Sequence, residues 1–223
     1  MTDLLILGDS FCRWRETDKH WPFLIENEKP RGVGFSGCSW WSVRKYLLGE
    51  LKLQTKPKTI IFCHTEASRI PHQKNLSLNY STVNEGGRLV EHDSYGPKSV
   101  DYPEIIQAAK KYYAHLHDPR FAWWTNNMWY KELDEILLKE KIEKVIHLYS
   151  FDLRGGPGDK YDYSGTYKFK KGVTIIKPLI EYVKDLKKDH NHLPEELNIK
   201  LGLALKDIIN TYPGDGVRLN NVM

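Results

Sequence analysis

Short apolar runs recur along the chain at intervals typical of buried strands. Their residues are apolar or β-branched, without the polar alternation of a half-exposed strand. The runs occupy residues 3–7, 31–35, 58–63, 144–149 and 172–176. Longer stretches with apolar residues at helical spacing fill the intervals between them. Because strands alternate with helices, the pattern predicts an α/β fold with a parallel sheet covered on both faces.

The same periodicity defines the helical stretches. Between Ser39 and Leu53, for example, apolar side chains repeat at intervals that place them on one helix face. Pro194, followed by two glutamates, is typical of a helix start, since proline suits the first turn and acidic side chains favour that end. The predicted helices cover residues 11–26, 39–53, 103–117, 124–142, 179–188 and 194–211.

Two intervals, at residues 71–102 and 151–171, are too long to be simple connections. They predict functional loops or contacts with a partner. We expect a single domain over residues 1–211, with a helical and loop insertion at about 71–135 after the third strand. The polar residues 212–223 are predicted to form an extended tail.

The composition narrows the class of protein. The chain has 223 residues, of which 40% are hydrophobic and 28% charged, as in soluble globular proteins. Its net charge of +4 comes from 33 basic and 29 acidic residues without a dense basic block, so no nucleic-acid partner is predicted. The apolar runs are too short to span a membrane, and the sequence begins without a signal peptide, which predicts a cytoplasmic location.

Cysteine and histidine residues give no metal-binding pattern. The three cysteines have no metal-type spacing and are predicted to be free thiols in a reducing compartment. Two histidine pairs lack the two further ligands that a structural zinc site needs, so we expect no metal. These residues are Cys12, Cys38, Cys63, His115, His117, His190 and His192.

The first strand runs directly into Gly8-Asp9-Ser10-Phe11. A serine there projects from the carboxyl end of a parallel strand, with the N–H groups of a following helix close by, and is a candidate nucleophile. Gly-Asp-Ser is also ordinary turn and helix-cap chemistry. The tripeptide alone therefore leaves both interpretations open.

A serine nucleophile needs a base, an acid that orients the base, and N–H donors for the oxyanion. Asp189-x-x-His192 follows the last predicted strand, and the three-residue offset lets the carboxylate fold back on the imidazole. Gly37 follows the second strand and offers a backbone N–H beside that of Ser10. We expect these loops to meet at one end of the sheet, where the loop after the third strand supplies a further group.

Three short blocks together resemble those of the SGNH, or GDSL-type, hydrolases. Gly8-Asp9-Ser10-Phe11, Gly34-Phe35-Ser36-Gly37 and Asp189-x-x-His192 match the family in order and separation over most of the chain. The resemblance implies a three-layer flavodoxin-like fold whose five-stranded parallel sheet has the order 2-1-3-4-5. It also implies that Ser10 is the nucleophile, His192 the base and Asp189 its orienting acid, with Ser10 and Gly37 as oxyanion donors. Members hydrolyse esters, thioesters, lipids or acetylated sugars, usually without a metal, and we expect no cofactor.

The chain departs from this family after the third strand. Members usually carry Gly-x-Asn-Asp there, and the asparagine donates to the oxyanion, whereas this chain has Glu66 at about that position. Losing one oxyanion donor costs about 10² to 10³ in rate. A carboxylate about 4 Å from the oxyanion adds about 4 kcal/mol of repulsion at an effective dielectric of about 20. Three alternatives remain: Glu66 pairs with Arg69 and points away, His64 or Thr65 donates instead, or hydrolysis has been lost.

The leading hypothesis is a serine hydrolase that cleaves a small-molecule or carbohydrate ester. A carbohydrate is favoured if the aromatic group at Trp123, Trp124, Trp129 and Tyr130 is exposed beside the site, although these residues also fit a helix core. The alternative is a catalytically weak or inactive protein of the same fold with a binding or structural role, such as a phage particle component that forms a homo-oligomer or a larger assembly. A flavodoxin-like ligand-binding protein is a third, weaker interpretation.

Overall fold

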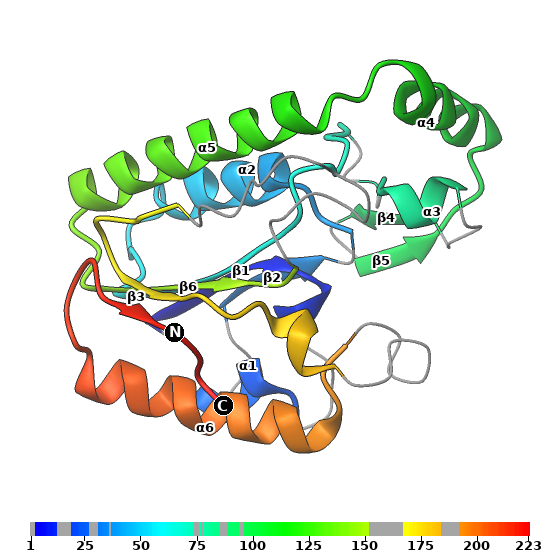
Figure 1. Ribbon diagram of the computed structural model, residues 1–223. Coiled ribbons are helices and arrows are strands. Elements are labelled where there is room, and N and C mark those ends of the chain that lie inside the picture. The colour runs from blue at the N-terminus through cyan, green and yellow to red at the C-terminus, as the bar shows by residue number, and fades with distance from the viewer. Residues whose placement is uncertain are drawn as a thin grey trace.

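A parallel sheet of six strands, in the order β2-β1-β3-β6-β7-β8, forms the centre of the computed structural model (Figure 1). The strands are β1 (Leu4–Asp9), β2 (Arg31–Phe35), β3 (Thr59–His64), β6 (Lys144–Tyr149), β7 (Val173–Ile175) and β8 (Arg218–Leu219). The structure describes residues 3–12, 19–26, 31–35, 37–73, 76, 78–84, 89–93, 96–151, 167–183 and 192–223. The α/β class and the parallel sheet are confirmed.

The sheet has six strands and not the five predicted. All five predicted strands are present, and β8 adds a sixth beside β7 from within the predicted tail. Thr174 N–H donates to the carbonyl of Val217 at 2.9 Å, and Gly216 N–H donates to the carbonyl of Gly172 at 2.9 Å. Backbone hydrogen bonds hold this short strand in place. It contains no apolar run, so the sequence pattern did not reveal it.

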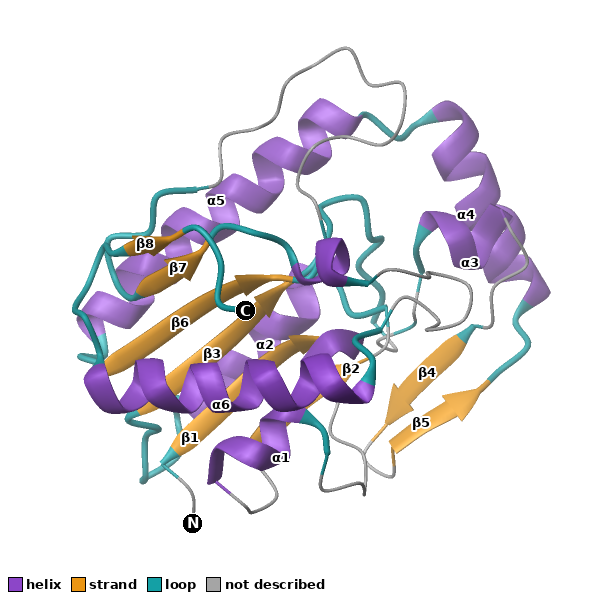
Figure 2. Cartoon of the chain, turned by 60° about the horizontal axis from the view of Figure 1, so that its bottom comes forward, coloured by secondary structure: helices purple, strands orange, loops and turns teal. Residues whose placement is uncertain are grey.

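Helices cover the two faces of the sheet, as predicted (Figures 1 and 2). Leu4 and Ile6 pack on the face covered by α1 (Trp21–Glu26) and α6 (Glu195–Thr211). Leu5 and Leu7 pack on the opposite face, under α2 (Trp40–Glu50) and α5 (Pro119–Lys139). This alternation along β1 divides the interior into two buried cores.

Two predicted helices are shorter than expected. The predicted helix at 11–26 contains a 3-10 turn at Ser10–Cys12 and the single short helix α1, with residues 13–18 outside the described residues. The predicted helix at 179–188 begins as a 3-10 turn at Leu179–Tyr182, and residues 184–188 lie outside the description. The other predicted helices are present within a few residues of their expected ends.

The insertion after β3 forms a third core of its own, which we call the satellite core. It contains α3 (Tyr80–Asn84), α4 (Pro103–His115) and a two-stranded hairpin of β4 (Val90–Asp93) and β5 (Gly96–Ser99), which the sequence pattern did not predict. The hairpin and α3 lie beside the main sheet and not within it (Figure 2). The buried apolar residues of the satellite core are Leu76, Leu78, Val83, Leu89 and Ala109.

Within the described part of the chain, no helix combines the length and apolar character that crossing a membrane requires.

Candidate functional site

The candidate site lies at the carboxyl edge of the sheet, where β1 ends. Gly8 faces β3 at this point, and a Cβ atom there would lie 2.5 Å from the carbonyl oxygen and 2.6 Å from the Cβ of Cys63. Such distances are far inside van der Waals contact, so glycine is required for β1 to pack against β3.

Ser10 starts the 3-10 turn that follows β1 directly, and its side chain is half-buried. The turn is held by Asp9, whose Oδ1 accepts a hydrogen bond from the backbone N–H of Phe11 at 3.1 Å. The Asp9 side chain is therefore hydrogen-bonded to the backbone two residues further on, across Ser10. This geometry fixes the conformation of the turn, and the role of Ser10 as a nucleophile remains a prediction.

His192 lies beside this turn, although it comes from the other end of the chain. Its ring centroid is 5.8 Å from that of Phe11, the residue after Ser10, with an angle of 34° between the rings. The side chain of His192 is half-buried. Asp189, the predicted orienting acid, lies outside the described residues.

A buried carboxylate that the sequence analysis did not single out lies next to Ser10. Asp9 is fully buried, and its Oδ1 accepts a second hydrogen bond from Ser150 Oγ at 2.7 Å. Its Oδ2 lies 3.5 Å from Nη2 of Arg69. Burial raises the pKa of Asp9, while Arg69, Ser150 and the Phe11 N–H oppose that rise. The only signal in the sequence was an acidic residue at the end of a wholly apolar strand.

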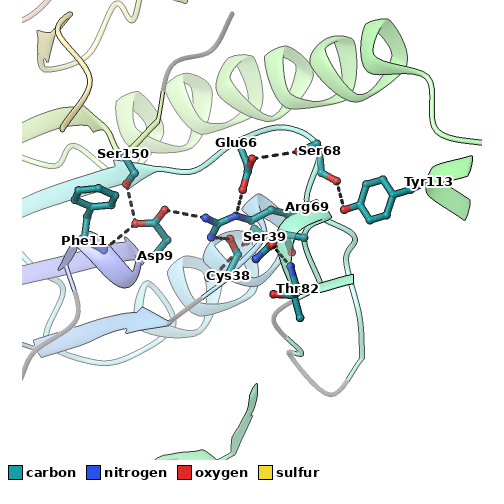
Figure 3. Close-up of polar contacts among 11 residues, drawn as sticks. Asp9, Phe11, Cys38, Ser39, Glu66, Ser68, Arg69, Thr82, Tyr113 and Ser150 are labelled. Atoms are coloured by element: carbon teal, nitrogen blue, oxygen red, sulfur yellow. Dashed lines mark hydrogen bonds and ion pairs between the residues drawn. The ribbon is translucent and has the colours of Figure 1, made fainter. Parts of the chain in front are cut away.

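Arg69 occupies the centre of this network (Figure 3). The residue is only 4% exposed, and its Nε donates to Oε1 of Glu66 at 2.9 Å. Its Nη1 donates to the carbonyl oxygen of Cys38 at 3.1 Å, and its guanidinium carbon lies 5.0 Å from the ring centroid of Phe151. Burial alone would lower the pKa of Arg69, but the carboxylates of Glu66 and Asp9 outweigh it and raise that pKa.

Glu66 forms the ion pair that the first of the three alternatives requires. Its side chain is 33% exposed and contacts both Nε of Arg69 and, at 3.4 Å, the hydroxyl of Ser68. The guanidinium therefore offsets the charge of the Glu66 carboxylate.

His64 is not available as an oxyanion donor. Its Nε2 lies 2.9 Å from Nδ1 of His147, whose Nε2 lies 3.0 Å from the carbonyl oxygen of Lys171. Because a carbonyl only accepts, His147 carries its proton on Nε2, and His64 must donate its own Nε2 proton to His147. Burial holds the pKa of His64 well below its usual value, and burial lowers that of His147 to about 3. Both rings are therefore neutral, and the single N–H of His64 is engaged.

Thr65 is also buried, and its hydroxyl approaches the Asp9 carboxylate without completing a hydrogen bond. It lines a cavity of about 10 Å³ at the end of β3, together with side chains such as Trp40, Asn126 and Tyr130. A cavity of this size has room for about one water molecule, so it does not accommodate an acyl group.

Gly37 has a φ of 68°, in the left-handed region that glycine adopts without strain. The carbonyl of the next residue, Cys38, is the acceptor for Arg69. Gly37 is thus a turn glycine at the carboxyl edge, and its service as an oxyanion donor remains a prediction.

The predicted aromatic group divides between core and surface. Trp129 and Tyr130 are buried under the sheet, as the core interpretation expects. Trp124 is 52% exposed and stacks on Phe121 with 6.1 Å between ring centroids. Because α5 runs antiparallel to the strand that follows it, its first turn lies toward the carboxyl edge of the sheet (Figure 2).

The three cysteines are free, and the described residues hold no cluster of metal-binding side chains. Cys12, Cys38 and Cys63 are free and buried, which confirms the predicted free thiols. Among the residues that the structure describes, no three histidine, cysteine or acidic side chains gather as a metal site would require.

Comparison with known proteins adds no family assignment. No family model, curated protein or solved structure shows significant similarity to this chain. The resemblance to the SGNH hydrolases therefore rests on the sequence blocks alone.

Proposed function

We propose that the protein is a serine hydrolase of the SGNH type that cleaves an ester bond. The observation that carries the proposal is the position of His192, whose ring lies 5.8 Å from that of Phe11, next to the candidate nucleophile Ser10. Two loops from opposite ends of the chain therefore converge at the carboxyl edge of a parallel sheet, the usual place for active sites in such folds. The strand order supports a flavodoxin-like topology extended by one strand.

In the proposed mechanism, the Ser10 hydroxyl oxygen attacks the ester carbonyl carbon while His192 accepts its proton. The carbonyl oxygen becomes an oxyanion that accepts hydrogen bonds from the backbone N–H groups of Ser10 and Gly37. The carbon–oxygen bond then breaks, and His192 protonates the departing alcohol. Water, deprotonated by His192, releases the acid from Ser10. Asp189 orients the imidazole, and no step requires a metal or cofactor.

The substrate proposed is a small-molecule or carbohydrate ester. Of the predicted aromatic group, Trp124 is exposed and stacks on Phe121, while Trp129 and Tyr130 are buried. A carbohydrate ester stays in the proposal because sugar rings present apolar faces that such exposed rings can contact. The Glu66–Arg69 ion pair supports retained activity, since it reduces the repulsion between the Glu66 carboxylate and a developing oxyanion.

A serine-reactive fluorophosphonate probe tests the proposal directly. We expect covalent labelling of the purified protein at Ser10, located by peptide mass spectrometry. Labelling should disappear in Ser10→Ala and fall by about 10³ or more in His192→Ala, because the hydroxyl loses its base. A Ser10→Ala protein that hydrolyses an ester as fast as the wild type would contradict the mechanism.

A second candidate function is a binding or structural role without efficient catalysis. The observation that favours it is the third block, where Glu66 only accepts and the proton of His64 is engaged by His147. Well-folded protein that resists the probe and elutes as a large oligomer on a sizing column would support this role and argue against the hydrolase.

A further inference from the structure

We propose that Arg69 is a positioning residue that fixes two segments relative to each other: the turn Ser10–Cys12, called the nucleophile turn, and the loop after β2 that contains Gly37 and Cys38. This inference rests on the hydrolase function proposed above. Arg69 follows the third strand, yet its guanidinium contacts residues next to both proposed oxyanion donors. Figure 3 shows the guanidinium with Asp9 to its left, Glu66 above it and Cys38 below it.

The first set of Arg69 contacts reaches the nucleophile turn through Asp9. Arg69 Nη2 lies 3.5 Å from Oδ2 of Asp9, and Oδ1 of the same carboxylate accepts from the N–H of Phe11 at 3.1 Å. Because Asp9 and Phe11 flank Ser10 in the chain and the carboxylate joins them, a change in the position of the carboxylate should change the direction of the Ser10 N–H and hydroxyl. Ser150 fixes the carboxylate from the remaining side through its 2.7 Å hydrogen bond.

The second set of Arg69 contacts reaches the loop after β2. Arg69 Nη1 donates to the carbonyl oxygen of Cys38 at 3.1 Å, and that carbonyl belongs to the residue that follows Gly37. The left-handed backbone of Gly37 leaves its orientation to be set by such neighbouring contacts. Arg69 thus connects the loops that carry both proposed oxyanion donors.

Glu66 and Phe151 hold the guanidinium itself in place. Nε donates to Glu66 at 2.9 Å, and the guanidinium lies over the ring of Phe151, which packs edge-on against Phe11 at 5.4 Å between centroids. The planar fork of arginine donates to Glu66 and Cys38 in fixed directions while its charge pairs with Asp9, whereas a lysine ammonium is a point charge on a flexible stem. The charge of Glu66 therefore compensates the buried guanidinium, which a neutral asparagine at the same position would not do.

The test compares Arg69→Lys with the matched control Arg44→Lys. Arg44 also pairs with a glutamate, at 2.6 Å to Glu132, and lies 5.1 Å over the ring of Trp41, but these partners belong to α5 and α2 and not to either oxyanion loop. The readouts are the rate of Ser10 labelling per folded molecule, kcat and KM for a small ester, and amide exchange of Phe11 and segment 37–39. We expect Arg69→Lys to lower the labelling rate and kcat by about 10- to 100-fold, as a misplacement of about 1 Å does. KM should stay unchanged, amide exchange at both loops should accelerate, and Arg44→Lys should match the wild type.

Chemical rescue separates positioning from general destabilisation. If Arg69→Ala folds, guanidinium ions at low millimolar concentration should restore labelling with saturation, while equal sodium chloride should not. The proposal is overturned if Arg69→Lys labels at the wild-type rate per folded molecule with unchanged exchange at both loops. If the wild type itself is not labelled, the hydrolase proposal fails, and amide exchange alone then decides whether Arg69 holds the two loops.

Discussion

At the scale of single residues, the most demanding group is the carboxylate of Asp9. It is fully buried, and an unpaired carboxylate in such a place would be very costly. Its stability depends on a few donors, of which the Ser150 hydroxyl at 2.7 Å is the shortest. These donors come from different strands and loops, so the carboxylate links segments that are distant in the sequence.

Replacement of Ser150 measures this dependence. Ser150→Ala removes a hydrogen bond to a buried carboxylate and should lower the free energy of unfolding by about 1.5–3 kcal/mol, as measured by urea denaturation. The matched control is Ser68→Ala, which removes a 3.4 Å contact to the partly exposed Glu66 and should change it by less than about 0.5 kcal/mol. Equal effects of the two variants would contradict the importance assigned to the buried carboxylate.

At the scale of elements, helices α2 and α6 each contain a glycine, for different reasons. In α6, a Cβ atom at Gly202 would lie 2.9 Å from the Cβ of Leu24, so the glycine permits the close approach of α1 and α6. In α2, a Cβ atom at Gly49 would meet nothing within 4 Å. The first glycine is required by packing, whereas the second only weakens its helix.

Alanine substitution should therefore have opposite effects at the two positions. Gly49→Ala should raise the free energy of unfolding by about 0.5–1 kcal/mol, because alanine is the better helix former. Gly202→Ala gains the same propensity but forces α1 and α6 apart, so we expect a net loss of about 1–3 kcal/mol. Thermal unfolding followed by circular dichroism distinguishes them, and stabilisation at both positions would show that α1 does not pack as described.

At the scale of the whole molecule, the histidine pair between β3 and β6 makes the free energy of unfolding depend on pH. His64 and His147 lie in a stack of nearly parallel rings with Phe62 and Phe169. Burial depresses both histidine pKa values in the folded state, that of His147 to about 3. In the unfolded chain both return to about 6.5.

This difference predicts a loss of stability in acid. Above pH 6.5 neither state binds protons at the pair, so its full contribution is present. As the pH falls below 6.5, the unfolded state takes up protons that the folded state refuses, and the free energy of unfolding decreases. Between pH 7 and pH 5 the loss should be about 2 kcal/mol per histidine, measured by urea denaturation. The double variant His64→Phe, His147→Phe should show a much flatter dependence, and an unchanged slope would contradict the assignment.

The main sheet could be predicted from the sequence because its central strands are buried on both faces and therefore form continuous apolar runs. The β4–β5 hairpin and β8 were missed, since backbone hydrogen bonds hold them without such runs. By contrast, the Glu66–Arg69 ion pair could be foreseen from the three-residue spacing of its partners. Ser150 and His147 were not, because they reach the site through the pairing of β3 with β6.

The steric demand at Gly8 has a consequence for how such motifs persist through evolution. Both the bare backbone at this position and the acid that follows it are required by packing and by the ion-pair network, whatever chemistry the molecule performs. Ser10 is only half-buried, so packing restricts its identity less than it restricts that of the two residues before it. In a lineage that abandoned catalysis, the glycine and aspartate of Gly-Asp-Ser should be retained while the serine is replaced. The residue at the third position should then indicate whether selection for the reaction continues.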